Sequence, residues 1–299
     1  MSDGWTVLSI LRTTTRFLEE RGVSEPRLSA EHLLADVLAC RRLDLYLRFD
    51  RPLSSDELES YRSRVKRRLS GEPVQYITGV AGFRGLELGV DRRVLVPRPE
   101  TELLVGEVLD WARAEAARGR APGAGWRVLD LGTGSGAIAC ALALELEGVR
   151  LVVGSDRSRD ALAVARANAA RVGAARTAWV NADGLSGLRP AARFDAIVSN
   201  PPYIAEAERA SLPAEVGEWE PEGALFAGPA GTEAIARLIR EAPAHLRAGG
   251  LLAVEIGSGQ DREATRLVEE TAGLEFLAVY RDFTRAARGV LALATGGED

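Results

Sequence analysis

Hydrophobic residues recur every three or four positions along the first 78 residues, which is the spacing of amphipathic helices. The period is clear from Trp5 to Leu18, again from Leu33 to Leu38, and a third time from Leu58 to Leu69. Each stretch has one apolar face, which is buried from solvent when the helices pack against one another. The pattern therefore predicts an N-terminal helical bundle over residues 1–78.

The pattern changes between residues 79 and 96, where short alternating segments are separated by Gly82, Gly85 and Gly89. Alternation with glycine at the turns is typical of a β-hairpin, and we expect a hairpin linker here. It runs into the segment 96–102, in which two prolines impose an extended chain before Glu100 or Thr101 starts a helix. This segment either only begins the helix or also forms one wall of a ligand-binding cleft.

Buried strands and helices alternate over the remaining residues, 97–299, which indicates a parallel α/β sheet. Apolar runs that read as strands lie at 126–131, 150–154, 177–180, 194–198 and 251–256, with helices between them. The last two strands, 276–280 and 290–294, are expected to pair antiparallel. We therefore predict a Rossmann-like catalytic domain over residues 97–299.

A glycine-rich loop follows the first of these strands and opens a helix, as in a nucleotide-binding βαβ unit. Its residues are Gly132, Thr133, Gly134, Ser135 and Gly136. The spacing is GxGxG rather than GxGxxG, and no lysine follows as in a P-loop. The loop thus suits a ligand without a pyrophosphate, and Asp130, just ahead of it, is a candidate partner for an ammonium group.

Two further acidic residues follow strands of the same sheet. Asp156 ends the second strand, where a carboxylate can hold a ribose diol, although capping the next helix is an alternative role. Asp183 follows the third strand and can accept from an exocyclic amine, while the backbone N–H of Gly184 can reach a ring nitrogen. Amino acid, ribose and adenine sites in this order match S-adenosylmethionine.

The fourth strand ends in Asn200, Pro201, Pro202 and Tyr203. The prolines stop the strand and make a stiff turn at the sheet edge where ligands bind. The Asn200 side-chain carbonyl and the Pro201 backbone carbonyl can hold both hydrogens of a planar NH2 group lying on the Tyr203 ring. Such acceptors stabilise the positive charge that develops on nitrogen during attack, so we expect Asn200, Pro201 and Tyr203 to be catalytic.

The segment 204–232 is long and acidic, and we expect a loop at the rim of the substrate site. The whole chain of 299 residues carries a net charge of -5 with a pI of about 5.4, so no stable binding to nucleic acid is expected. No apolar run reaches membrane-spanning length, no signal peptide is apparent, and the few cysteines and histidines lack metal-ligand spacing. We expect a cytoplasmic, monomeric protein that uses no metal.

Together these motifs resemble the release factor glutamine N5-methyltransferases, the PrmC or HemK family. The similarity covers nearly the whole chain and is carried by GEPVQYITG at 71–79, VPRPETE at 96–102, DLGTGSGAIA at 130–139, SNPPY at 199–203, EPEGALFAG at 220–228 and RDFTRAARG at 281–289. The resemblance implies a class I S-adenosylmethionine-dependent methyltransferase fold and S-adenosylhomocysteine as product. It also implies methylation of the glutamine amide in the GGQ motif of peptide chain release factors, with the helical bundle as docking domain.

Three other functions are weighed against this one. An N6-adenine DNA methyltransferase shares the NPPY turn, but the chain has no basic, aromatic-interleaved target-recognition domain. A methyltransferase for a ribosomal-protein glutamine is closer, yet that sister group tends to replace the Pro-Glu-Thr segment. A cofactor-binding protein without catalysis has no reason to keep Asn200 and Tyr203.

Overall fold

The computed structural model describes residues 4–189 and 191–296, which form two compact units. The first unit is the chain up to Val80 together with the segment Pro213–Trp219, and the second comprises Ala81–Leu212 and Glu220–Asp299. The sequence-based boundaries left residues 213–219 in the catalytic domain. The structure packs this segment with the N-terminal helices instead.

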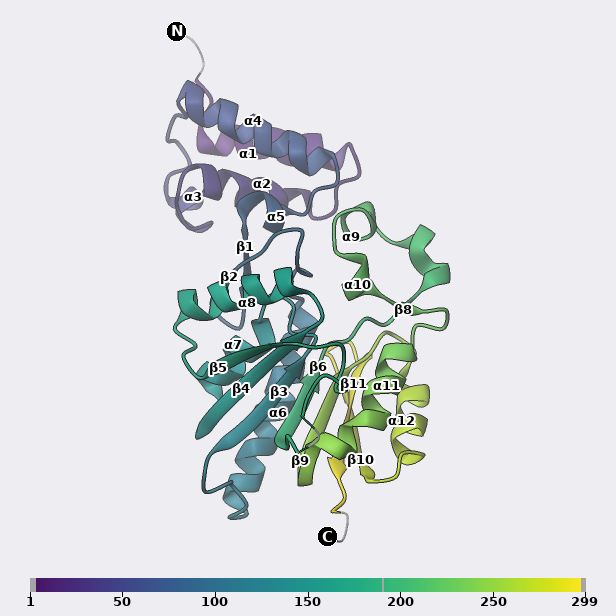
Figure 1. Ribbon diagram of the computed structural model, residues 1–299. Helices are drawn as coiled ribbons and strands as arrows, with labels where there is room; N and C mark the ends of the chain where they lie inside the picture. The colour runs from purple at the N-terminus through teal and green to yellow at the C-terminus, as the bar shows by residue number, and fades with distance from the viewer. Residues whose placement is uncertain (1–3, 190, 297–299) are drawn as a thin grey trace. The chain divides into compact units, whose positions relative to one another are not determined.

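The N-terminal unit is a helical bundle, as the hydrophobic period predicts (Figure 1). Its helices are α1 (Val7–Glu19), α2 (Pro26–Val37), α3 (Asp44–Leu47), α4 (Ser55–Leu69) and α5 (Val74–Thr78). Capping boxes start α1 at Thr6 and α4 at Ser54, where a side-chain oxygen accepts from a backbone N–H of the first turn. Arg68, which is 5% exposed, pairs with Glu215 at 2.5 Å and so joins the segment 213–219 to the bundle.

The second unit is built on a sheet of seven strands in the order β10-β11-β9-β6-β3-β4-β5 (Figure 1). The strands are β3 (Trp126–Leu131), β4 (Val149–Asp156), β5 (Thr177–Asn181), β6 (Phe194–Ser199), β9 (Leu246–Glu255), β10 (Leu274–Arg281) and β11 (Ala287–Ala294). The five strands from β9 to β5 are parallel, and β11 pairs antiparallel with both β9 and β10. The expected antiparallel pair at the end of the chain is confirmed.

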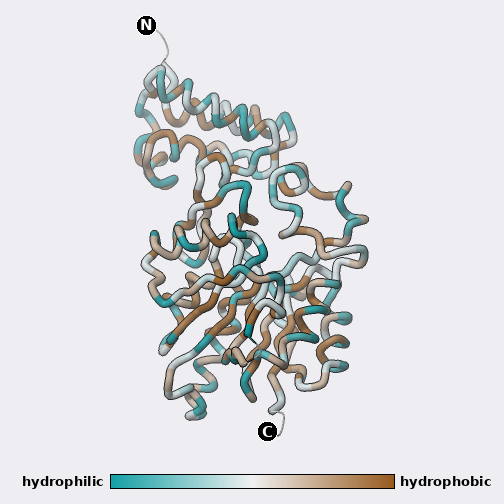
Figure 2. Tube along the Cα trace, in the orientation of Figure 1, coloured by the Kyte–Doolittle hydropathy of each residue, from teal (hydrophilic) through white to brown (hydrophobic). Residues whose placement is uncertain are grey.

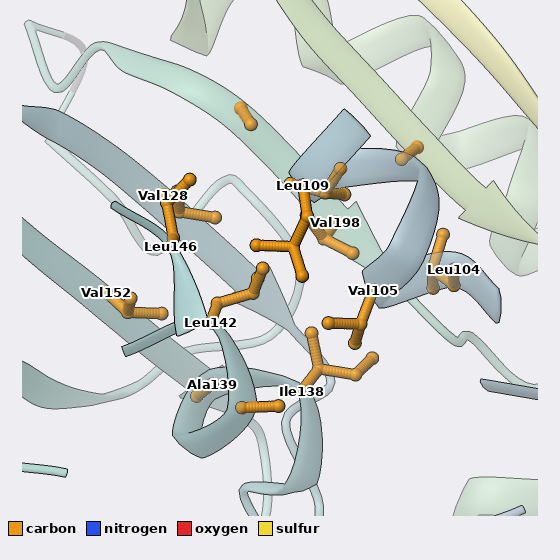
Figure 3. Packing of buried hydrophobic residues seen from close by; sticks show 14 of the residues in the cluster. Leu104, Val105, Leu109, Val128, Ile138, Ala139, Leu142, Leu146, Val152 and Val198 are labelled. Carbon is orange, nitrogen blue, oxygen red and sulfur yellow. The ribbon is translucent and has the colours of Figure 1, made fainter. Parts of the chain in front are cut away.

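Helices cover both faces of this sheet. They are α6 (Pro99–Ala117), α7 (Ala137–Glu145), α8 (Arg159–Val172), α11 (Glu233–Glu241) and α12 (Asp261–Glu269). Apolar residues of α6 and α7 pack on one face, where Leu104, Val105 and Leu142 meet Val128 and Val198 (Figure 3). Residues of α11 and α12 form a second core on the other face. The central strands are therefore hydrophobic along their length (Figure 2).

Three segments complete the second unit. Strands β1 (Val80–Phe83) and β2 (Leu86–Gly89) form the expected hairpin, which is shorter than the stretch 79–96. Helix α11 is followed directly by the short 3-10 helix η2 (Ala242–His245), which leads into β9. No helix of the described residues is long and apolar enough to cross a membrane.

The segment expected to be a long rim loop contains several short elements. They are β7 (Ile204–Ala205), η1 (Glu206–Ser211), α9 (Ala214–Gly217), α10 (Glu222–Leu225) and β8 (Phe226–Gly228). Strands β7 and β8 pair in parallel and bring the two ends of the segment together. The polar composition suggested a loop because elements of two to six residues are too short to show a hydrophobic period.

Candidate active site

A cavity of about 590 Å³ opens at the carboxyl ends of β3, β4, β5 and β6. Ligands bind at this edge of an open α/β sheet because the parallel strands deliver their following loops to one side. The residues that line the cavity include Gly132, Gly134, Asp156, Asp183, Gly184, Asn200, Pro201 and Pro202. The structure thus brings together most of the residues singled out in the sequence, although they span about seventy positions.

The glycine loop is held against the second strand by Asp156. One carboxylate oxygen accepts from the backbone N–H of Gly134 at 2.9 Å, and the other accepts from the N–H of Ser158 at 2.8 Å. Ser158, not Asp156, is the side-chain cap of α8. Each carboxylate oxygen can accept more than one hydrogen bond, so Asp156 retains acceptor capacity toward the cavity.

Gly136 ends the loop as the residue before α7, with φ near 80°. A Cβ atom at this position would lie 3.0 Å from the Cβ of Ala165 in α8. Positive φ and close packing both favour glycine here, which keeps the amino end of α7 facing the site.

Asp130, Thr133 and Ser135 lie behind the cavity and not on its surface. Asp130 is completely buried and accepts hydrogen bonds from the Thr133 hydroxyl at 2.5 Å and the Ala139 N–H at 3.0 Å. Its Oδ1 atom has no hydrogen-bond partner among the described residues, and burial raises its pKa to about 7. An unpartnered buried oxygen of this kind fits a cationic group approaching from the cavity side.

Asp183 and Gly184 are held by Arg237 of α11, a residue that the sequence did not reveal. The guanidinium donates to the Asp183 carboxylate at 3.2 Å and to the Asp183 backbone carbonyl at 3.0 Å. A Cβ at Gly184 would lie 2.8 Å from the Arg237 guanidinium, so the absent side chain leaves room for the arginine. Arg237 lines the cavity beside them. A planar cation in this place can stack on an aromatic ring system.

Asn200 lies at the carboxyl end of β6, partly buried and on the cavity surface. Its side-chain Nδ2 donates to the Thr101 hydroxyl of α6 at 3.0 Å. The amide is therefore oriented by its nitrogen end, and the Oδ1 atom is the end left to accept from a ligand.

Tyr203 follows the turn but does not line the cavity. Its ring lies against Gly257, and its backbone carbonyl accepts from Gln260 at 2.9 Å. Burial raises the pKa of Tyr203 to about 12, and the nearby Glu255 carboxylate acts in the same direction. Tyr203 is half-buried beside the turn, and contact of its phenol with a substrate stays a prediction.

The segment 96–102 supports the turn from behind. Arg98 pairs with the buried Glu220 at 2.6 Å, and Thr101 binds Asn200. Glu255, at the end of β9, is the other site residue that the sequence did not single out. It is an acidic residue closing an apolar strand, which is the same signal that marked Asp130 and Asp156.

The arrangement suits a ligand with three kinds of polar group. Asp130 can face a cation, Asp156 can accept from neighbouring hydroxyls, and Asp183 with Gly184 can hold a base. These polar groups therefore fit the functional groups of S-adenosylmethionine. Asn200 supplies one further hydrogen-bond acceptor in the same cavity.

Two domain families match the chain. The PrmC N-terminal domain matches residues 9–79, and the methyltransferase small domain matches residues 120–215. A methyltransferase from Pyrococcus furiosus has the same fold, with a TM-score of 0.50 and 16% identity over 78% of this chain and 98% of that one. The hMettl16 catalytic domain, solved in complex with the MAT2A 3'UTR hairpin 6, aligns with a TM-score of 0.52 and 18% identity over 72% of this chain and 77% of its own. The second unit is thus a class I S-adenosylmethionine-dependent methyltransferase fold.

Curated relatives match over most of their length. The release factor glutamine methyltransferase of Chlorobaculum tepidum is 45% identical over 97% of this chain and 98% of its own. The Rhodopirellula baltica enzyme of the same name is 39% identical over 93% of this chain and 93% of its own. The Geobacter sulfurreducens enzyme is 43% identical over 86% of each chain. The chain therefore belongs to the release factor glutamine methyltransferases.

Proposed function

We propose that this chain methylates the side-chain amide nitrogen of the glutamine in the GGQ motif of peptide chain release factors, with S-adenosylmethionine as donor. The observation that carries the proposal is the placement of Asn200. Asn200 lines the cavity and its Nδ2 donates to Thr101, so its Oδ1 atom can serve as an acceptor for an incoming NH2 group. The cytoplasm, where translation ends, is the expected location.

The cofactor supplies a methyl group on a positively charged sulfur. Asp156 would accept from the ribose hydroxyls, while Asp183 and the Gly184 N–H would hold the adenine. The glycine loop and the buried Asp130 would take the amino acid end. A ligand held in this way would run across the carboxyl ends of adjacent parallel strands, toward Asn200, which lines the same cavity.

The remaining groups act on the substrate amide. An amide nitrogen is a weak nucleophile, since its lone pair is delocalised into the carbonyl. Asn200 Oδ1 and the Pro201 backbone carbonyl would each accept one of its hydrogens and so offset the positive charge that grows on nitrogen. When bound, the cofactor would supply the methyl group, so that an N–C bond replaces the S–C bond, the proton released from nitrogen passes to water, and S-adenosylhomocysteine is the product.

We also infer that the N-terminal unit docks the release factor. Its surface carries large exposed side chains in and beside α3, namely Leu43, Leu47 and Phe49. Exposed apolar groups gathered in one short segment are typical of an interaction surface. Leu47→Asp should raise KM for an intact release factor while leaving the affinity for S-adenosylmethionine unchanged. Equal KM values for the variant and the wild type would remove α3 from the docking surface.

The direct test uses S-adenosylmethionine labelled in the methyl group and a purified release factor. We expect label on the release factor and none on a variant in which the glutamine of GGQ is replaced by glutamate. A ribosomal protein preparation and duplex DNA serve as competing acceptors. Label on DNA or on the ribosomal protein, with none on the release factor, would reject the proposal.

A further inference from the structure

The side chain of Gln260 binds the far end of the turn that begins with Asn200, and it takes no part in the cofactor or amide contacts proposed above. Its Nε2 atom donates to the backbone carbonyl of Tyr203 at 2.9 Å and to that of Gly231 at 3.1 Å. Its Oε1 atom accepts from the backbone N–H of Gly257 at 2.9 Å. One amide thus joins three segments, namely the turn after β6, the loop before α11 and the loop after β9.

These backbone partners fix which way the Gln260 amide points. A backbone carbonyl can only accept a hydrogen bond, and a backbone N–H can only donate one. If the amide were turned by 180°, its oxygen would face the carbonyls of Tyr203 and Gly231. Its NH2 group would face the N–H of Gly257, so all three hydrogen bonds would be lost. The side chain therefore has one orientation that satisfies every partner.

Two glycines allow the neighbouring loops to approach the turn closely. A Cβ atom at Gly231, where φ is 78°, would lie 2.8 Å from the Tyr203 carbonyl oxygen and 2.9 Å from the backbone nitrogen of Ala205. A Cβ atom at Gly257 would lie 3.1 Å from Gln260 Oε1 and 3.1 Å from Cδ2 of the Tyr203 ring. The missing side chains leave the space that the Gln260 amide and the Tyr203 ring occupy.

Two simpler roles do not account for the Gln260 side chain. The residue directly precedes α12, but its side chain makes no capping hydrogen bond to that helix. It does not line the cavity, so it does not contact a ligand held there. Both polar atoms of the amide are instead bound to the end of the turn and to the two loops beside it.

We propose that Gln260 is a positioning residue that sets the direction of the Pro201 backbone carbonyl and the place of the Tyr203 ring. The inference rests on the proposed function, in which this carbonyl accepts a hydrogen of the substrate amide. Both prolines of the turn have φ locked at about −65°, so little freedom remains between Asn200, which follows β6, and Tyr203, which Gln260 holds. Releasing the Tyr203 end lets the Pro201 carbonyl rotate away from the substrate nitrogen.

Two variants of similar shape test the proposal by activity. Gln260→Glu keeps an acceptor for Gly257, but its ionised carboxylate has no hydrogen to donate to the Tyr203 and Gly231 carbonyls. Gln260→Met keeps the length of the side chain and removes all three hydrogen bonds. We expect each variant to lower kcat for a release factor by about tenfold to a hundredfold, because a displacement of about 1 Å can slow a reaction by about a hundredfold. The Kd for S-adenosylmethionine should stay unchanged, and a wild-type kcat in both variants would overturn the proposal.

Thr271→Val is the matched control for a loss of stability. The Thr271 hydroxyl donates to the Leu267 backbone carbonyl at 2.6 Å, beyond the other end of α12. The substitution removes a side-chain hydrogen bond to the backbone near the same helix without touching the turn, so kcat per folded molecule should stay at the wild-type value. A fall in kcat equal to that of Gln260→Met, at equal melting temperature, would show that lost stability alone explains the effect and would reject the positioning role.

Hydrogen exchange of the backbone amides gives a test that needs no substrate. Both Gln260 variants should exchange faster than the wild type in residues 203–205 and at the wild-type rate in the glycine loop, 132–136. The Gly257 N–H should exchange faster in Gln260→Met than in Gln260→Glu, because only the first lacks an acceptor. Unchanged exchange in residues 203–205 would reject the positioning role even if release factors are methylated. A wild type that fails to methylate release factors, while exchange responds as expected, would count against the proposed function alone.

Discussion

The two sides of the cavity are held in different ways. On the side that we propose to bind the cofactor, Asp156 accepts from the backbone N–H groups of Ser158, two residues away, and Gly134, 22 residues away. On the amide side, Asn200 is oriented by Thr101, which lies 99 residues away in the chain, through a side-chain contact alone. The first side is formed by neighbouring loops of one βαβ unit, and the second exists only after α6 has packed on the sheet.

This difference predicts how substitutions in each half of the cavity affect binding and turnover. Asp156 holds the glycine loop through the Gly134 N–H, so its loss should act on the half of the cavity proposed to bind the cofactor. Asn200, in contrast, is held by another side chain, so a change at Thr101 should be transmitted to Asn200. Substitutions on the two sides should therefore affect different constants, Kd on one and kcat on the other.

The largest effect is expected for Asn200→Ala. Loss of one preorganised acceptor should cut turnover by about a hundredfold to a thousandfold while leaving the Kd for S-adenosylmethionine nearly unchanged. Asn200→Asp keeps an acceptor but adds a charge, and it should retain partial activity if the role is purely electrostatic. Single-turnover methylation and melting temperature should be measured together. A destabilised Asn200→Ala with a normal rate per folded molecule would show that the residue only ends a strand.

For Asp156→Ala we expect the opposite result, a loss of cofactor affinity with little change in turnover. A hydrogen bond to a charged group contributes about 1.5 to 3 kcal/mol, so the affinity for S-adenosylmethionine should fall by about tenfold to a hundredfold. Calorimetric titration measures this directly. Turnover at saturating cofactor should change much less than the affinity, and an unchanged Kd would remove Asp156 from the cofactor site.

Glu255→Gln should also alter how stability depends on pH. The folded pKa of Glu255 is raised by burial to about 7 from an ordinary value of 4.5, so the folded protein holds more protons than the unfolded chain between these values. The free energy of unfolding therefore falls as the pH rises from 4.5 to 7. The variant lacks this loss and should gain about 2 to 3 kcal/mol relative to the wild type between pH 5 and pH 8, because a pKa raised from 4.5 to about 7 costs about 1.4 kcal/mol per pH unit over that range. Denaturant unfolding of both proteins at pH 5 and pH 8 measures this. An equal change in the free energy of unfolding in the variant and the wild type would contradict the prediction.

Arg237→Ala should have the smallest effect. Its ion pair with Asp183 is largely exposed, with 41% and 72% of the two side chains accessible, and such pairs contribute about 0 to 1 kcal/mol. We expect the affinity for S-adenosylmethionine to fall by about fivefold or less, and hydrogen exchange to rise in residues 182–188. Arg237→Lys is the matched control, because it keeps the charge but not the planar group that could stack on adenine. A loss in Arg237→Lys equal to that in Arg237→Ala would favour stacking over charge.

The cofactor side could be worked out from the sequence because its signals are local. A strand, a glycine loop and a helix follow one another from Trp126 to Glu145, and each parallel strand ends with its own polar residue. Parallel strands deliver such residues to one edge whatever the details of packing. The order of strands and loops along the chain is therefore enough to place Asp156, Asp183 and Asn200 around one cavity.

The contacts between residues that lie far apart in the chain were decided by tertiary packing alone. Thr101 appeared only as a helix start, and the packing of α6 on the sheet is what brings its hydroxyl to Asn200. Arg237 of α11 donates to the Asp183 backbone carbonyl in the loop after β5, and residues 213–219 belong to the N-terminal unit, where Glu215 pairs with Arg68. These contacts link residues 50 or more positions apart. Hydrophobic periodicity and short motifs carry no information on such pairs, since they report the element a residue lies in and not the element that packs against it.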